Sequence, residues 1–444
     1  MRLPVRTVTT AAGAIAVALG GLAVPAANAG HSATPQFKTV AYFTQWGIYG
    51  RQYFVRNVAT SGAAARLTHL NYAFANVGET GQCFEANIPG QGDAWADFQR
   101  PVGAEESVDG VADVAGQPLM GSFNQLRKLK RQNPRLSVQI SIGGWSWSKF
   151  FSVAAASRAS REAFVASCVD LFIRGNLPQL DGSAQGGPGS GAGVFDGIDL
   201  DWEWPGSEGN PGNVISPADR HNFTLLVAEF RRQLDAAGRR AHRHYTLTAF
   251  LPADPAKIDA GFEAGRIFRY LDFATVQGYD FHGPWETTTN HQSAVFTPAG
   301  QPTLPDFTAE RAIDAWISRG APRRELVLGV PFYGHGWTGV NNADNGLFQP
   351  ATGGAAPGTF EAGSEDYKVL AGLTGKGYTL FRDPRSLHAW LFNGSTFWTF
   401  DDPVVLRAKT AYIRTKGLGG AMAWSLDGDD PTGSLVKALA GGLR

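Results

Sequence analysis

Apolar, strand-like runs alternate with amphipathic, helix-like segments along most of this chain of 444 residues. Eight runs rich in β-branched and aromatic residues are expected to form strands, at residues 39–43, 69–74, 136–142, 194–204, 245–250, 273–279, 326–330 and 420–424. Amphipathic segments predict helices between several of them, at residues 123–130, 161–173, 217–237 and 309–319. Eight strand–helix units favour a (β/α)8 barrel of the α/β class, although the spacing alone also allows a doubly wound sheet.

The first 29 residues have the features of a secretory signal peptide. Arg2 and Arg6 precede an apolar stretch at residues 11–24, and residues 27–29 offer the small side chains of a cleavage site. This stretch is too short to span a bilayer, and no later segment is long and apolar enough to do so. We therefore expect a secreted, extracellular protein with no membrane partner, whose mature chain is residues 30–444.

The balance of charges argues against several classes of partner. The chain has 39 basic and 39 acidic side chains, so its formal net charge is zero. Nothing in this balance points to nucleic acid or to a charged membrane surface. The 12 tryptophans fit a carbohydrate-binding protein, because aromatic rings stack on the apolar faces of sugars, although tryptophan is also ordinary core material. We expect the protein to be a monomer.

The chain has two cysteines, Cys83 and Cys168. Such a pair in an exported protein is expected to form a disulfide, and two buried free thiols are the alternative. Two cysteines are too few for a cysteine-based metal site, and the histidines show no metal-ligand spacing with carboxylates. The sequence therefore predicts a disulfide and no metal.

A row of carboxylates lies inside the fourth strand-like run. Residues 196–203 read Asp-Gly-Ile-Asp-Leu-Asp-Trp-Glu. Side chains alternate between the faces of a strand, so Asp199, Asp201 and Glu203 share one face and the apolar residues between them share the other. A solvated edge strand would carry this row at little cost, but the large apolar residues indicate that both faces are buried. Crowding of like charges then raises at least one pKa, as in an acid that stays protonated near neutral pH.

This run resembles the active-site strand of family 18 of the glycoside hydrolases, the chitinase family. The family's pattern is Asp-Gly-x-Asp-x-Asp-x-Glu, and all of its fixed residues are present here. The resemblance extends from about Phe37 to the end of the chain and favours the (β/α)8 barrel over the doubly wound sheet. It also implies a small α+β insertion domain, at residues 337–395, in the long interval between the last two strands.

The resemblance implies a role for each carboxylate of the row. Glu203 is the expected general acid for the glycosidic oxygen, and the family uses the 2-acetamido group of the substrate as the nucleophile in place of a second carboxylate. Asp201 would hold the acetamido N–H, and Asp199 would share a proton with Asp201. Asp196 has the opposite parity and is expected to be structural. The resemblance implies no cofactor.

The end of the sixth strand carries a second family motif. Residues 277–280 read Gln-Gly-Tyr-Asp and resemble the family's Met-x-Tyr-Asp. The resemblance implies that Tyr279 donates a hydrogen bond to the acetamido oxygen and that Asp280 hydrogen-bonds the same sugar. Gln277 replaces the usual methionine, which changes one wall of the sugar site.

The third and seventh strands add weaker matches. Residues 141–144 resemble the family's Ser-x-Gly-Gly motif, in which Ser141 can hydrogen-bond the buried carboxylates and glycines such as Gly144 let the backbone approach the acidic row. Tyr333 is expected to contact the sugar. His335 stands where the family commonly has arginine, which predicts that a sugar contact is lost or becomes pH-dependent.

Several aromatic side chains are expected to line a substrate groove. Trp424, at the end of the eighth strand, would form the floor under the distorted sugar, and Tyr42 and Phe74 would flank it. Trp145 and Trp285 follow the third and sixth strands and would bind sugars further out. For these two outer tryptophans, core packing is the alternative role.

Together these features predict a secreted chitinase that hydrolyses β-1,4-linked N-acetylglucosamine with retention of configuration. An endo-β-N-acetylglucosaminidase acting on glycoprotein glycans is an alternative, disfavoured by the long interval between the last two strands. A non-catalytic chitin-binding lectin is another, disfavoured by the presence of Glu203. Hydrolysis of peptidoglycan or of a spore wall is a further alternative.

Overall fold

Eight parallel strands close into a barrel in the structure, a computed structural model that describes residues 37–302 and 306–444. Neighbours in the chain are neighbours in the barrel, and β1 pairs with both β2 and β17, which closes the sheet. This confirms the predicted (β/α)8 barrel. The barrel strands are β1 (Lys38–Thr44), β2 (His69–Val77), β6 (Ser137–Gly143), β7 (Gly197–Asp201), β8 (Thr246–Leu251), β9 (Phe273–Val276), β10 (Leu326–Pro331) and β17 (Gly420–Trp424).

The fourth barrel strand is shorter than predicted. The sequence indicates a strand over residues 194–204, whereas β7 covers Gly197–Asp201. Gly197 allows this strand to lie close to β8, because a Cβ at this position would be 2.3 Å from the carbonyl oxygen of Thr246. Glu203 therefore stands just beyond the strand, at the end of the barrel where catalytic groups of such folds lie.

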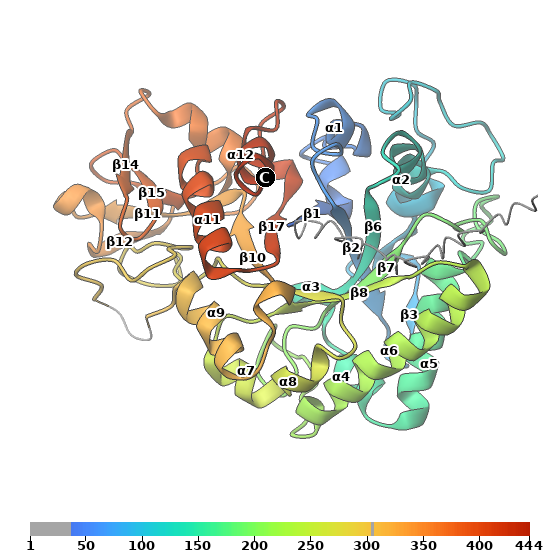
Figure 1. Ribbon diagram of the computed structural model, residues 1–444. Helices are drawn as coiled ribbons and strands as arrows, with labels where there is room; N and C mark the ends of the chain where they lie inside the picture. Colours follow the sequence, from blue (N-terminus) through green and yellow to red (C-terminus); the bar gives the residue numbers. More distant parts are fainter. Residues whose placement is uncertain (1–36, 303–305) are drawn as a thin grey trace, which may run out of the picture. The chain divides into compact units, whose positions relative to one another are not determined.

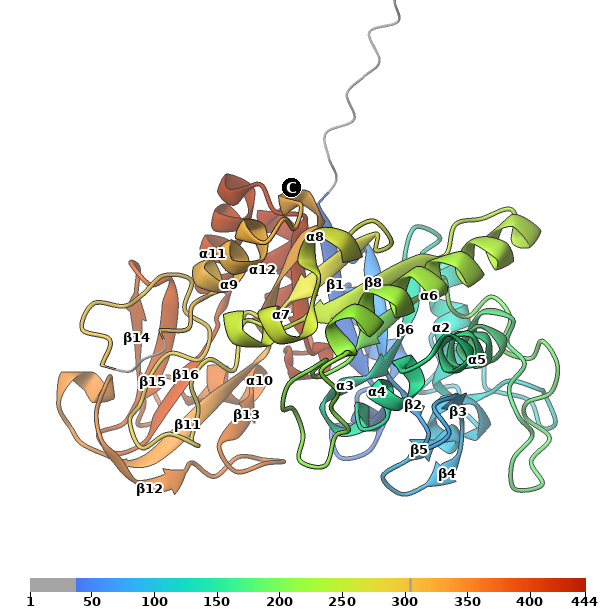
Figure 2. The same cartoon turned by 90° about the horizontal axis from the view of Figure 1, so that it is seen from below.

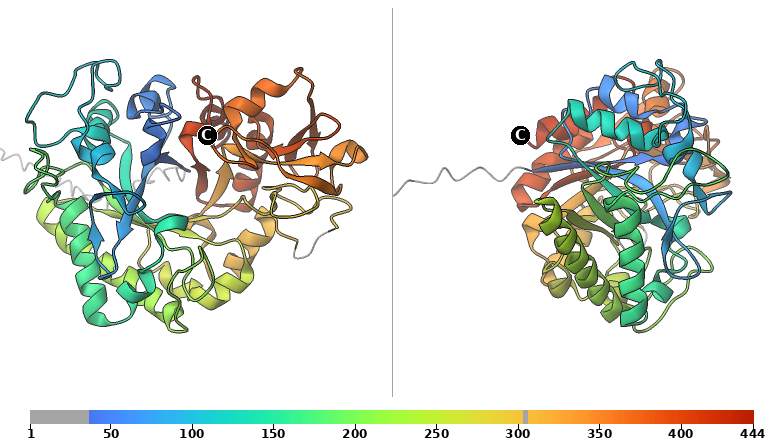
Figure 3. Two further views of the ribbon diagram at one scale, coloured as in Figure 1. Left: turned by 180° about the vertical axis from the view of Figure 1, so that it is seen from behind. Right: turned by 90° about the vertical axis from the view of Figure 1, so that its right-hand side faces the viewer.

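Helices surround the barrel (Figures 1 and 3). Helix α11 shows how the sequence sets their ends, because Asp402 accepts hydrogen bonds from the first-turn N–H groups, Pro403 opens the helix and Gly417 ends it in the left-handed conformation. The described α-helices are α1 (Val55–Thr60), α2 (Gly121–Gln132), α3 (Gly144–Trp147), α4 (Phe151–Ala155), α5 (Arg158–Cys168), α6 (Asp219–Ala241), α7 (Pro255–Gly261), α8 (Ala264–Ile267), α9 (Ala309–Ser318), α10 (Tyr367–Leu370), α11 (Pro403–Lys416) and α12 (Ser434–Gly442).

A second sheet lies in the chain between β10 and β17, and Figure 2 shows it on the opposite side of the barrel from α5 and α6. Its antiparallel strands enclose a small apolar core that includes Trp337, Trp390 and Phe397. The sheet runs from residue 333 to residue 400, beyond the predicted insertion boundaries of 337–395, which stay a prediction. Its strands are β11 (Tyr333–Val340), β12 (Ala351–Ala355), β13 (Ser364–Asp366), β14 (Thr379–Asp383), β15 (His388–Phe392) and β16 (Phe397–Phe400).

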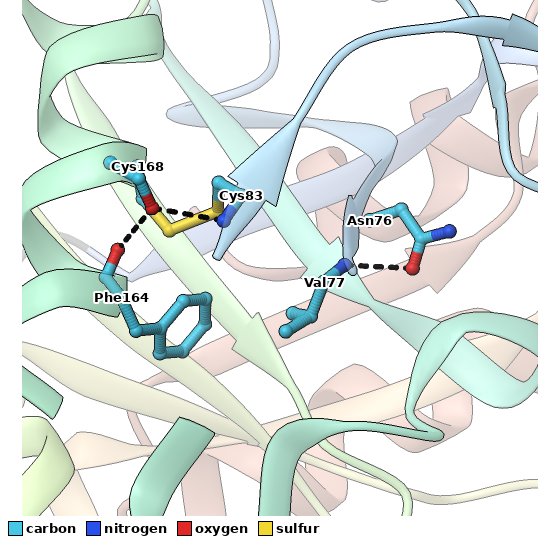
Figure 4. The surroundings of a disulfide bond; sticks show 6 residues. Asn76, Val77, Cys83, Phe164 and Cys168 are labelled. Atoms are coloured by element: carbon cyan, nitrogen blue, oxygen red, sulfur yellow. Dashed lines mark hydrogen bonds between the residues drawn. A yellow bond between two sulfur atoms is a disulfide. The ribbon is translucent and has the colours of Figure 1, made fainter. Parts of the chain in front are cut away.

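A disulfide joins Cys83 to Cys168, as the sequence predicts (Figure 4). Cys83 lies on β3 (Cys83–Phe84), which pairs with the end of β2, and Cys168 is the last residue of α5. The backbone N–H of Cys83 also donates to Ser167 Oγ at 2.9 Å. The disulfide and this hydrogen bond attach the segment at Cys83 to helix α5. The segment continues through β4 (Asn87–Ile88) and β5 (Gly92–Asp93).

Two sequence predictions concern the membrane and the N-terminus. None of the helices within residues 37–302 and 306–444 is long and apolar enough to cross a membrane. The predicted signal peptide, residues 1–29, lies outside the described residues.

Candidate active site

Asp199 lies inside the barrel, surrounded by hydroxyl groups from three other strands. Its Oδ2 accepts hydrogen bonds from Tyr42 on β1 (2.7 Å) and Ser141 on β6 (2.8 Å), and its Oδ1 accepts one from Thr248 on β8 (2.6 Å). Burial raises the pKa of Asp199, and these hydrogen bonds oppose the rise. Ser141 thus makes the contact with the row that the sequence suggested, and Tyr42 reaches the row through its hydroxyl.

Asp201 is the last residue of β7, two positions after Asp199. Its side chain is buried, and its Oδ1 has no hydrogen-bond partner within the described part of the chain. Burial, followed by the negative charges of Glu203 and Asp199, raises the pKa of Asp201 well above its usual range. This carboxyl group therefore holds a proton readily, and one of its oxygens is available to a ligand that brings its own donor.

Two side chains fix the backbone of Glu203 just beyond β7. The Glu203 N–H donates to Ser148 Oγ (2.8 Å), and the carbonyl oxygen accepts from Asn213 Nδ2 (2.9 Å). Burial, followed by the negative charge of Asp280, raises the pKa of Glu203 to about 8, against the opposing charge of Lys257. Glu203 is therefore largely protonated at neutral pH, the state that a general acid needs.

The other face of this segment is core. Ile198 and Leu200 are fully buried, and Trp202 is 1% exposed. Asp196, at the start of the segment, forms an ion pair with Lys130 (2.7 Å) far from the acid. The alternation of faces is therefore as expected, and Asp196 has the structural contacts that its parity suggests.

A cleft with a volume of about 1160 Å³ lies over the acidic row, with walls from the barrel and from the second sheet. Asp199 is fully buried and does not line this cleft. The predicted site residues that line the cleft are Tyr42, Phe74, Trp145, Asp201, Glu203, Gln277, Tyr279, Asp280, Trp285, Tyr333 and Trp424.

The two glycines of the Ser-x-Gly-Gly motif take different places, and the predicted substrate contact of Gly144 stays a prediction. Gly143 lines the cleft, whereas Gly144 packs beneath Phe74, whose ring would lie 2.6 Å from a Cβ at position 144. A Cβ at Gly143 would lie 2.3 Å from the carbonyl oxygen of Asp201, and both glycines have a positive φ. The pair therefore brings backbone and ring close to the acidic row, and Gly143 is the member that faces the substrate space.

An aromatic floor lies beside the acid. The rings of Trp424 and Phe74 stack with centroids 5.7 Å apart, and Tyr42 meets Trp424 edge-on at 5.1 Å. Further out, Trp145 is 49% exposed and Trp285 is 60% exposed. Exposed tryptophans that line a cleft favour the ligand-binding alternative over the core-packing alternative for these two residues.

Tyr279 and Asp280 follow β9 and line the cleft. Burial, followed by the charge of Asp280, raises the pKa of Tyr279 well above its usual range, so its hydroxyl keeps its proton and can donate a hydrogen bond. Asp280 Oδ1 accepts hydrogen bonds from the Tyr333 hydroxyl and from His335 Nε2, the latter at 2.8 Å. Asp280, which is predicted to bind the sugar, is therefore held in place by two protein side chains.

The sequence analysis missed several residues of the cleft. Trp46 is 42% exposed and contacts both Phe74 and Trp424. It follows β1 as Trp145 follows β6, so the rule that strand ends carry the site could have found it. Arg51, Phe360 and Lys257 also line the cleft, and no motif in the sequence marked them.

No metal site accompanies these groups in the part of the chain that the structure describes. No cluster of three or more histidine, cysteine, aspartate or glutamate side chains there could hold a metal ion. The cleft offers a protonated carboxyl group, a second carboxyl group beside it, a phenol and a floor of aromatic rings.

Curated relatives share most of this chain. Chitinase A1 of Niallia circulans is 36% identical over 430 residues, which cover 89% of this chain and 57% of the relative. Chitinase 63 of Streptomyces plicatus is 38% identical over 411 residues, which cover 91% of this chain and 60% of the relative. The chain thus spans about three fifths of the length of these relatives.

A solved structure agrees over nearly its whole length. The catalytic domain of the psychrophilic chitinase B from Arthrobacter TAD20 matches with a TM-score of 0.88 and 46% sequence identity, over 92% of this chain and 96% of that chain. The family description "Glycosyl hydrolases family 18" matches residues 38–429, which include the barrel, the acidic row and the second sheet. The chain therefore belongs to glycosyl hydrolase family 18.

Proposed function

We propose that this protein is a secreted chitinase that cleaves β-1,4 linkages between N-acetylglucosamine units with retention, using the substrate's acetamido group as the nucleophile. The observation that carries this proposal is the pair formed by Glu203 and Asp201 in the cleft. Glu203 has a pKa of about 8 and serves as the acid. The chitinase names of the relatives and of the similar structure agree with this substrate.

The state of Asp201 supports a nucleophile that comes from the substrate. A retaining enzyme with a carboxylate nucleophile needs that group ionised beside the acid. Asp201 is the neighbouring carboxyl group, and its pKa is raised well above its usual range by burial and by the charges of Glu203 and Asp199. It is therefore a poor nucleophile but a suitable partner for the N–H of an acetamido group.

The proposed reaction has two steps. Glu203 gives its proton to the glycosidic oxygen as the bond from that oxygen to C1 breaks, and the acetamido carbonyl oxygen bonds to C1 to form an oxazolinium ion. Asp201 accepts a hydrogen bond from the acetamido N–H, and the Tyr279 hydroxyl donates to its carbonyl oxygen. Water then attacks C1 on the face that the leaving group vacated, the bond from C1 to the acetamido oxygen breaks and its electron pair returns to that oxygen, and the Glu203 carboxylate takes a proton of the water. The acid and the acetamido group are thus restored and the configuration is retained.

The anomer of the first product tests this proposal. Acetylated chitin oligomers should give the β-anomer first in proton NMR, and fully deacetylated chitosan should not be cut because it lacks the internal nucleophile. An initial α-anomer, or cleavage of the deacetylated polymer, would contradict the mechanism. Cleavage of a high-mannose glycopeptide without cleavage of chitin oligomers would favour the endo-β-N-acetylglucosaminidase alternative. Binding of chitin oligomers without any cleavage would favour the chitin-binding lectin.

A further inference from the structure

Lys257 is a cation in the cleft that has no carboxylate in contact with it in the part of the chain that the structure describes. It lies on α7, the helix that follows β8, and it is half-buried among the cleft residues. Within residues 37–302 and 306–444 it forms no ion pair or hydrogen bond, and its ammonium lies over the ring of Trp204 with 5.5 Å to the centroid. By contrast, the buried lysines Lys128 and Lys409 each pair with an aspartate. The charge of Lys257 is therefore not neutralised by a contacting carboxylate among the described residues, and it lies in the cleft that also contains Glu203.

Glu203 precedes Trp204 in the chain, and the positive charge of Lys257 acts to lower the pKa of Glu203. Two opposite charges from different walls bear on the acid: Asp280 favours its protonated form and Lys257 favours its ionised form. The other titratable groups that act on Glu203, on Lys257 or on both are Asp201, Tyr279, Tyr333, Asp254 and Glu208. Lys257 is the group of this set that carries a positive charge.

We propose that Lys257 is a positioning residue for proton transfer, whose ammonium stabilises the carboxylate that Glu203 becomes when the leaving oxygen has taken its proton. The inference rests on the proposed function. In the first step the electron pair of the broken bond stays on the leaving oxygen, the proton moves to that oxygen, and negative charge is left on Glu203. An ammonium already fixed near this charge lowers the barrier because it need not reorganise during the reaction.

A charge-removing variant tests the inference, with a charge-keeping variant for rescue. Lys257→Met keeps the apolar stem against Trp204 and removes the charge, so the pKa of Glu203 should rise. The alkaline limb of kcat/KM on chitin oligomers should then move to higher pH, by up to about one unit, while kcat falls several-fold because the acid is weaker. Lys257→Arg should restore both values. Lys149→Met is the matched control, since Lys149 also lies over an aromatic ring, Phe150 at 5.1 Å, but does not line the cleft.

The leaving group separates proton transfer from general damage. A nitrophenyl glycoside of the same oligomer leaves with little help from an acid, so Lys257→Met should lose far less kcat on it than on the natural oligomer. An equal loss on both substrates, an unmoved alkaline limb, or no rescue by Lys257→Arg would overturn the inference.

A direct titration keeps the inference testable if the proposed substrate is wrong. Carbon-13 NMR of the Glu203 carboxyl group reports its pKa without turnover, and Lys257→Met should raise that pKa above its wild-type value. An unchanged pKa would refute the role of Lys257 whatever the substrate. Inactivity of the wild-type protein on chitin oligomers, together with a raised pKa in the variant, would instead refute only the proposed function.

Discussion

Two sets of buried carboxylates in this molecule have opposite electrostatics. Asp199 and Asp401 are both fully buried, the first inside the barrel and the second beside the second sheet. Asp401 forms an ion pair with the buried Lys409 at 2.6 Å and accepts a hydrogen bond from Ser293. Burial acts to raise the pKa of Asp401, but the charge of Lys409 and the contacts with His388 together outweigh it, so the pKa is lowered.

Within residues 37–302 and 306–444, no such cation contacts Asp199, Asp201 or Glu203. Neutral hydroxyl groups surround Asp199, and Asp201 keeps an oxygen without a partner within the described residues, so burial prevails and the pKa values of both are raised. The comparison teaches that the partner, more than the burial, decides what a carboxylate does here. A paired carboxylate stays ionised and holds two parts of the fold together, whereas an unpaired one can hold and give up a proton.

The largest expected effect is the loss of the acid. Glu203→Gln keeps the shape and hydrogen bonding of the side chain but has no proton to give, so turnover of chitin oligomers should fall by roughly 10²–10⁴. Binding of the oligomer, measured by calorimetry, should be largely kept. Glu162→Gln, on the outer helix α5, is the control and should leave turnover unchanged. Near-normal turnover by the Glu203 variant would show that the acid lies elsewhere.

Breaking the paired set should instead reduce stability. Lys409→Met leaves Asp401 buried without its cation, which is expected to cost about 3–5 kcal/mol in the free energy of unfolding. Lys416→Met is a matched control on the same helix, because Lys416 pairs with the half-exposed Asp314 at 2.8 Å, and its loss should cost about 0–1 kcal/mol. Urea denaturation measures both. Equal costs would mean that the Asp401–Lys409 pair contributes no more than a surface pair.

The sequence predicted one of these two sets and not the other. The acidic row is local, because three carboxylates alternate with apolar residues in a single run, and the barrel strands are visible for the same reason. The pair of Asp401 with Lys409 was not predicted, since neither residue belongs to a motif and Ser293, which completes the cluster, is 108 residues away from Asp401 in the chain. Contacts of this kind depend on how the second sheet packs, which periodicity does not encode.

The same limit applies to the cleft. The motif residues at the strand ends were found from the sequence, and so was Tyr333 at the start of the second sheet, but Phe360 and Asp366 further along the chain were not. Arg51, for example, forms an ion pair with Asp366 and lies over the ring of Phe360, both more than 300 residues further along the chain. The two adjacent glycines show the same limit, since which of Gly143 and Gly144 faces the cleft depends on the packing of Phe74.

Removing the middle carboxyl group of the unpaired row should change the pH dependence. Glu203 and Asp201 share their negative charge as they titrate, and whichever of them ionises first opposes the ionisation of the other. Asp201→Asn leaves Glu203 without this competitor, so the acid ionises more easily and the alkaline limb of the pH–rate profile should move to lower pH. Because the carboxyl groups titrate together, the measured values belong to the group. Asp196→Asn is the control on the same segment and should leave the limb in place. An unmoved limb in Asp201→Asn would leave that residue only a role in holding the acetamido group.

The smallest expected effect concerns Asp280. It is intermediate between the two sets because its partner, His335, is a cation only while the imidazole is protonated. His335 contacts it at 2.8 Å, and although burial acts to lower the pKa of His335, the hydrogen bond and the charge of Asp280 raise it above the ordinary value of 6.5. A folded-state pKa above the unfolded one means that the pair stabilises the fold fully below pH 6.5 and loses this contribution as the pH rises through the raised pKa.

His335→Gln should therefore lower the free energy of unfolding more at pH 5.5 than at pH 8.5. The difference should stay below about 1 kcal/mol, because the Asp280 side chain is 38% exposed and solvent screens the pair. His244→Gln is the control for a more exposed pair, since His244 contacts Asp272 at 2.7 Å with a side chain that is 58% exposed, and it should show a smaller difference. Denaturation of both variants at the two pH values makes the measurement. An equal loss in the free energy of unfolding at pH 5.5 and pH 8.5 for His335→Gln would mean that His335 acts as a neutral hydrogen-bond donor. Asp280 would then belong with the carboxylates that have no cation in contact.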